Sequence, residues 1–144
     1  MSASFFESCE FVIREDLVVA HERAWERIAA AGTWLNGSRR VAVAEEIRKA
    51  RERKSCFETR EALSPETVGI PNATSGLLND AEVELIHRVV CDPGRLSEGW
   101  SKSIIEKGLS AGEYVEIIGL IAMVMILDTF TMGLGISNVD LPEP

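Results

Sequence analysis

Cys56 is the residue whose surroundings most favour chemistry. Arg53 and Lys54 precede it closely, at the end of a strongly basic stretch. Because nearby cations lower the pKa of a thiol and raise its thiolate fraction, Cys56 is a candidate redox or nucleophilic cysteine. We also expect Cys56 at the C-terminus of a helix, where the helix dipole disfavours an anion, so a half-buried apolar role is the alternative.

Two histidines are candidate acid–base groups. His21 shares an apolar helical stripe with Leu17, Trp25 and Ile28, which places it in a core or a pocket. It is either a hydrogen-bonded packing residue or a general base. His87, which stands between an isoleucine and an arginine, is open to both interpretations.

Two acids, Glu116 and Asp128, lie on the most apolar stretch of the chain. A carboxylate buried there needs a partner, or its pKa is raised. On one helix the two would be about 18 Å apart at about 1.5 Å per residue, so they cannot form one carboxylate dyad. Each belongs either to a site or to a structural ion pair, with Arg88 or Arg95 as candidate partners.

The cysteine pattern excludes the common cysteine frameworks. Cys9, Cys56 and Cys91 are an odd, widely spaced set without a Cys-x-x-Cys pair, so neither a zinc ribbon nor a disulfide framework is predicted. Cys9 and Cys91 lie among apolar residues and are expected to be inert core positions. No histidines and acids fall at metal-ligand spacing, so we expect neither a metal nor another cofactor.

Composition and charge indicate the class of protein and its expected location. The chain has 144 residues, of which 46% are hydrophobic, enough for one domain with a true core. Its net charge of −8 argues against nucleic-acid and membrane-surface binding. No leader pattern opens the sequence, and the longest apolar run, 117–127, is shorter than the roughly 20 residues of a membrane span. We therefore expect a reduced, cytoplasmic protein.

The residues named above are expected to lie on helices or at helix ends. Periodicity and capping signals predict an all-α, single-domain bundle of about five to six helices over residues 1–144. The last helix is apolar nearly all round and is expected to be the central one. A Pro- and Gly-rich loop and an exposed tail complete the chain. The predicted ranges are helices at 5–31, 39–57, 79–92, 97–108 and 110–135, the loop at about 60–79 and the tail at 138–144.

The second of these helices is basic. Residues 38–60 hold eight basic and four acidic side chains. Such a run is usually a solvated face, and an anion- or nucleic-acid-binding patch is the alternative.

Several stretches together resemble a known superfamily. They are Thr33-Trp-Leu-Asn-Gly-Ser-Arg-Arg, Val83-Glu-Leu-Ile-His-Arg-Val-Val-Cys-Asp-Pro-Gly and Gly108-Leu-Ser-Ala-Gly-Glu-Tyr-Val-Glu-Ile-Ile-Gly. The pattern resembles the alkylhydroperoxidase-D-like, or carboxymuconolactone-decarboxylase-like, superfamily, in its bacterial branch that lacks the Cys-x-x-Cys pair. The resemblance implies an all-helical fold that assembles into homo-oligomers. It also implies, for thiol-active members, a Cys-x-x-Cys pair that reduces peroxides with electrons from a partner protein.

The resemblance assigns roles residue by residue. Cys56 matches the second cysteine of the pair, and Arg53 occupies the place of the first. The supporting glutamate is Glu45 or Glu46, and no histidine follows Cys56 closely. Without a neighbouring resolving thiol the usual local disulfide cannot form, so peroxidase activity is expected to be weak or absent.

Two other functions compete with a thiol antioxidant enzyme. One is a non-redox enzyme or small-molecule-binding protein with a helical pocket that contains His21, His87, Glu116 or Asp128. The other is an oligomeric scaffold. The expected partners are a second copy of the chain and either a thiol reductant protein or a small-molecule substrate.

Overall fold

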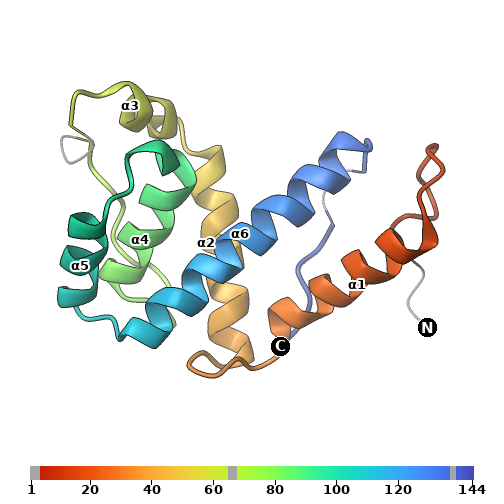
Figure 1. Ribbon diagram of the computed structural model, residues 1–144, viewed down its shortest axis with the longest axis horizontal. Coiled ribbons are helices and arrows are strands. Elements are labelled where there is room, and N and C mark those ends of the chain that lie inside the picture. Colours follow the sequence, from red (N-terminus) through yellow and green to blue (C-terminus); the bar gives the residue numbers. More distant parts are fainter. Residues whose placement is uncertain (1–3, 65–67, 137–138) are drawn as a thin grey trace.

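The computed structural model describes residues 4–64, 68–136 and 139–144, and this part of the chain contains helices and no β-strand. The predicted all-α class with five to six helices is confirmed (Figure 1). In chain order the elements are α1 (Glu15–Ala29), α2 (Gly37–Glu52), α3 (Ser55–Glu61), α4 (Asp80–Cys91), the 3-10 turn η2 (Pro93–Arg95), α5 (Glu98–Glu106) and α6 (Ala111–Gly133).

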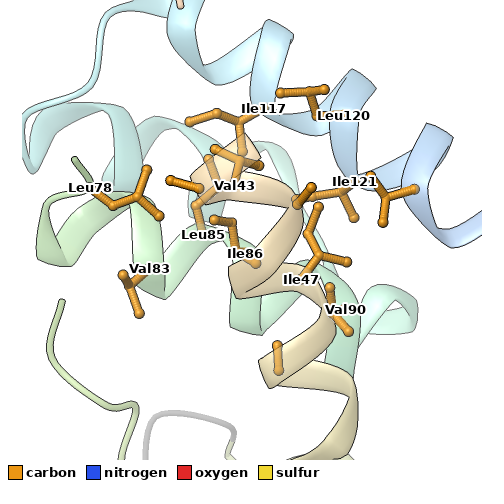
Figure 2. Packing of buried hydrophobic residues seen from close by; sticks show 14 of the residues in the cluster. Val43, Ile47, Leu78, Val83, Leu85, Ile86, Val90, Ile117, Leu120 and Ile121 are labelled. Atoms are coloured by element: carbon orange, nitrogen blue, oxygen red, sulfur yellow. The ribbon is translucent and has the colours of Figure 1, made fainter. Parts of the chain in front are cut away.

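The hub of the bundle is α2, which packs against α1, α3, α4 and α6. Its inner side chains, Val43 and Ile47, meet Leu85 and Ile86 of α4 and Ile117 of α6, and all five are fully buried (Figure 2). We expected α6 to be the central helix. It keeps an exposed apolar face instead, whereas α2, whose Ala42, Ala44 and Ala50 are buried, has neighbours on several sides.

Side-chain caps mark the starts of three helices. Asn79 with Glu82, and Ser110 with Glu113, each form a capping box in which side chain and backbone bond reciprocally, close to the predicted starts at 79 and 110. The side chain of Asn36 accepts a hydrogen bond from the backbone N–H of Arg39 and caps α2. These local signals therefore fix where α2, α4 and α6 begin.

Gly32 lies after the end of α1, where it allows a close approach to α6. α1 ends at Ala29, and Gly32 does not have the positive φ that Gly108 and Gly135 have. A Cβ at Gly32 would lie 1.8 Å from Oε1 of Glu116, so a glycine is needed for close approach to α6. A bulkier residue there would displace the carboxylate.

Two predicted helices are longer than the observed ones. The first begins at Glu15 rather than at residue 5, because Phe5 and Phe6 form a turn that folds back onto His21. The second ends at Glu52, and Arg53 takes an extended conformation before α3 starts. α3 occupies residues predicted to end a helix or to open the 60–79 loop.

The C-terminal segment, predicted to be an exposed end at 138–144, is docked over its described residues 139–144. Val139 and Leu141 pack against the core, and Trp25 Nε1 donates to the carbonyl oxygen of Asp140 at 3.1 Å. In Figure 1 this segment runs between α1 and α6. The segment is therefore part of the fold, although it remains partly exposed.

α6 is the one described helix that is long and apolar enough to cross a membrane, and 39% of its apolar window is buried inside the protein. A core helix passes the same test. Its two inward acids, Glu116 and Asp128, are tied to α2 by ion pairs. Its outer face exposes Val115, Ile126 and Met132, and a Cβ placed on Gly119 would have open space around it within the described chain.

Candidate functional site

The basic face of α2 is largely used in structural ion pairs. Arg40 Nη1 donates to Oε1 of Glu116 at 2.6 Å, and Arg48 contacts both carboxylate oxygens of Asp128 at 2.9 and 3.1 Å. Arg51 lies 3.2 Å from the same carboxylate. The partners of the two buried acids therefore come from α2 rather than from the expected Arg88 or Arg95, which the sequence could not indicate because the contacts span about 80 residues.

Glu116 stabilises a corner of the fold. Burial raises its pKa, but hydrogen bonds from the Trp34 N–H, at 2.9 Å, and from Arg40 outweigh that effect and hold the pKa below its ordinary value. The carboxylate is thus ionised and fully engaged. This leaves Glu116 without a free role in chemistry.

Cys56 and Cys91 form a disulfide, which corrects two predictions. We expected no disulfide and an inert Cys91, yet the two Cα atoms lie 5.1 Å apart across a sequence separation of 35 residues. Cys56 is 6% exposed and Cys91 is fully buried. The pairing was hidden because α3 folds back over the end of α4, a turn for which the sequence carries no strong local signal.

The helical position of Cys56 also differs from the prediction. It lies in the first turn of α3 rather than at the C-terminus of α2. Backbone N–H groups at a helix start favour an anion, so the dipole argument against a Cys56 thiolate is reversed.

A buried acid–base pair lies one helical turn from this disulfide. His87 Nε2 and Oε1 of Glu46 are 2.7 Å apart, while Glu45 points to the exposed side of α2. Of the two glutamates left open by the sequence, Glu46 is therefore the one next to a histidine. His87 precedes Cys91 by one turn on the same side of α4, and helical side chains lean toward the N-terminus, so Cys91 leans toward the imidazole.

The imidazole of His87 is held neutral. Burial lowers its pKa, and the hydrogen bond to Glu46, which raises it, does not compensate; the charge of Arg53 lowers it further. With Nε2–H donated to Glu46, Nδ1 is the free lone pair, and within the described chain it has no hydrogen-bond partner. This nitrogen is a buried proton acceptor.

Arg53 holds the segment around the disulfide together. Its Nη1 donates to the carbonyl oxygen of Gly69 at 3.2 Å, and its Nη2 lies 3.5 Å from Oγ1 of Thr59. Its own carbonyl accepts from the Cys56 N–H at 3.0 Å. Arg53 therefore shapes the turn into α3, where the resembled superfamily carries a cysteine.

His21 lies elsewhere, in an aromatic cluster. The rings of Phe5, Phe6 and Phe130 surround it at centroid distances of 5.8, 5.2 and 5.1 Å. Burial lowers the pKa of His21, and its Nε2 has no partner among the described residues. The structure thus does not bring His21, His87 and Glu116 into one place.

Two of the hollows on the described surface are lined by none of Cys56, Glu46, His21, His87 and Glu116, whereas Glu45 lines the second of them. One, of about 350 Å³, lies between the 68–70 segment, α4 and α5, and the other lies between α2 and the C-terminal segment. The described residues contain no group of three or more His, Cys, Asp or Glu side chains that could hold a metal ion.

Comparison with known proteins gives no match to a family model, to a curated protein or to a solved structure.

Proposed function

We propose that this protein is a thiol–disulfide oxidoreductase that reduces peroxides through Cys56 and Cys91. The observation that carries the proposal is a disulfide one helical turn from a buried, neutral histidine paired with a glutamate. A structural crosslink needs no such neighbour. The arrangement supports the superfamily resemblance, with a cysteine pair 35 residues apart in place of Cys-x-x-Cys.

The proposed cycle starts from the dithiol. The Cys56 thiolate attacks the terminal oxygen of a peroxide ROOH and the O–O bond breaks. Cys56 becomes a sulfenic acid, and the alkoxide takes up one proton and leaves as ROH. The Cys91 sulfur then displaces hydroxide from Cys56, which forms the disulfide and releases water. An external dithiol returns two electrons and two protons and becomes a disulfide itself.

His87 is the proposed base of this cycle. Its free Nδ1 accepts a thiol proton, and the Glu46 carboxylate stabilises the imidazolium that forms. Cys91 Sγ lies 3.6 Å from the carbonyl oxygen of Ala50, which can accept a hydrogen bond from the thiol of the reduced form. The resolving thiol therefore has a defined resting position.

The sequence alone predicts weak or absent peroxidase activity, because no resolving thiol lies near Cys56 in the chain. In the proposed cycle Cys91 is the resolving thiol, so we expect measurable turnover with a dithiol donor. The electron donor is a thiol reductant protein or small dithiol. A cytoplasmic location stays a prediction, and in that reducing compartment a disulfide is transient rather than structural.

The test uses the full chain reduced with a dithiol and then given one equivalent of hydrogen peroxide. We expect loss of two thiols and a Cys56–Cys91 linkage by peptide mapping, with steady-state peroxide consumption lost in Cys56→Ser and Cys91→Ser. Cys9→Ser is the matched control and should keep wild-type turnover. A pair that stays reduced under peroxide would overturn the proposal, and so would a disulfide that no dithiol reduces, since it would then be a structural crosslink.

The competing functions have less support. A helical-pocket enzyme needs at least two of His21, His87, Glu116 and Asp128 in one hollow, and they are dispersed. A homo-oligomer stays a prediction, for which the exposed apolar face of α6 is a surface of the right character. Light scattering on the wild type and on Ile126→Glu would test it.

A further inference from the structure

We propose that α3 is a lid that carries Cys56 and closes over Cys91, and that Arg95 is the residue that positions it, an inference that rests on the proposed redox function. α3 is attached at its two ends by contacts of different chemistry. The disulfide holds its first turn, and the guanidinium of Arg95 holds its C-terminal end. Only the first attachment is broken by reduction.

The Arg95 contact is a side-chain cap on α3. Nη1 donates to the carbonyl oxygen of Ala62 at 2.6 Å, and Nη2 donates to those of Thr59 at 2.5 Å and Arg60 at 3.3 Å. Carbonyls at the end of a helix lack intrahelical donors and carry its negative dipole end, so a cation there is stabilising.

Asp92 fixes the orientation of this clamp. The Arg95 Nε donates to Oδ2 of Asp92 at 2.8 Å, which turns both Nη groups toward α3. Asp92 is buried and immediately follows Cys91, so the clamp and the disulfide act on the same end of α4. Arg60 Nε adds a bond to the carbonyl oxygen of Cys91 at 3.3 Å.

A lid is needed because neither sulfur is accessible in the closed form. Cys56 is 6% exposed and Cys91 is 0% exposed, so a peroxide reaches Cys56 only when α3, with Cys56 on it, moves away from α4. Formation of the disulfide then requires α3 to return. In the dithiol form Arg95 therefore opposes the first step, oxidation of Cys56, and promotes the second, its condensation with Cys91.

The experiment measures the two steps separately in the reduced protein. In Arg95→Met we expect alkylation of Cys56 by iodoacetamide to be about tenfold faster, since a charge-assisted clamp is lost. After one equivalent of hydrogen peroxide, we expect slower disulfide formation and more sulfenic acid trapped by dimedone. Arg95→Lys, which keeps the charge but not the fork, should be intermediate. Arg14→Met, at an exposed ion pair on the far side of α1, is the control.

The outcomes separate this inference from the proposed function. Equal alkylation and equal disulfide formation in Arg95→Met and wild type would overturn the lid while the redox cycle stands. A wild type that forms no disulfide under peroxide would overturn the function, and the alkylation rates would still test the lid. Faster hydrogen exchange across the whole oxidised variant, rather than only at α3 of the reduced one, would make Arg95 a general stabiliser and overturn the inference.

Discussion

The protein buries two histidines in opposite kinds of surroundings. His87 lies between α2 and α4, bonded to the carboxylate of Glu46 and one turn from Cys91. His21 lies between α1, α6 and the N-terminal turn, enclosed by the rings of Phe5, Phe6 and Phe130. Burial lowers the pKa of both imidazoles.

Only one of the two buried histidines has surroundings suited to proton transfer. A neutral imidazole becomes a useful base only if the cation it forms is stabilised, and Glu46 provides that for His87. Besides Glu22, the acid whose charge raises the pKa of His21 is Asp128, whose carboxylate is already engaged by Arg48 and Arg51. The Cys56–Cys91 corner is therefore arranged for proton transfer, and the His21 cluster for packing.

The largest expected effect is a loss of stability when Cys91 of the disulfide is removed, compared with removal of Cys9 near the aromatic cluster. A crosslink that closes a loop of 35 residues stabilises a fold by about 4 kcal/mol, so Cys91→Ala should lower the free energy of unfolding of the oxidised protein by that amount. Cys9→Ala, beside the aromatic cluster, should cost well under 1 kcal/mol. Urea titrations with and without a dithiol measure this, and the Cys91→Ala difference should disappear in the reducing titration.

The next effect tests the packing role of the His21 cluster. Phe6 is 7% exposed and contacts His21, whereas Phe11 is 60% exposed. Phe6→Ala should destabilise the protein by about 3 kcal/mol and Phe11→Ala by less than about 0.5 kcal/mol. Thermal unfolding of both variants decides it, and equal midpoints would mean that the N-terminal turn does not contribute to the core.

The difference between local and long-range contacts explains how much of the fold could be predicted from the sequence. Local signals located α4, α5 and α6, since Asn79, Ser97 and Ser110 cap them through contacts three residues away. The apolar stripe also placed His21 and Trp25 correctly inside. These are properties that neighbouring residues determine.

The redox corner depended on contacts that no local pattern encodes. Cys56 meets Cys91 only because Arg53 breaks α2 and Arg95 fastens the new helix α3 onto η2. Glu46 meets His87 across 41 residues, and its position within a charged run concealed its burial. A 3.6-residue period does place Glu46 on the same side as Val43 and Ala50, which is the signal that could have found it.

Glu46→Gln should slow formation of the Cys56–Cys91 disulfide under peroxide by about tenfold, because the His87 imidazolium loses its counter-charge. Glu45→Gln is the matched control, since it makes the same change one residue away on the exposed side of α2. Quenched-flow thiol counting gives both rates. Equal rates in the two variants would remove the distinction between the two buried histidines.

The smallest effect is a pH dependence that both regions share. Each histidine has a folded-state pKa below its ordinary value of 6.5. Between the two pKa values the unfolded chain binds more protons than the folded one, so stability rises with pH there. The contribution of each group is complete above about pH 6.5 and is lost as the pH falls through its folded pKa.

His87→Gln and His21→Phe should each flatten the fall in unfolding free energy below that pH, as denaturant titrations at several pH values would measure. Curves that keep the wild-type slope in both variants would contradict the lowered pKa of the two imidazoles.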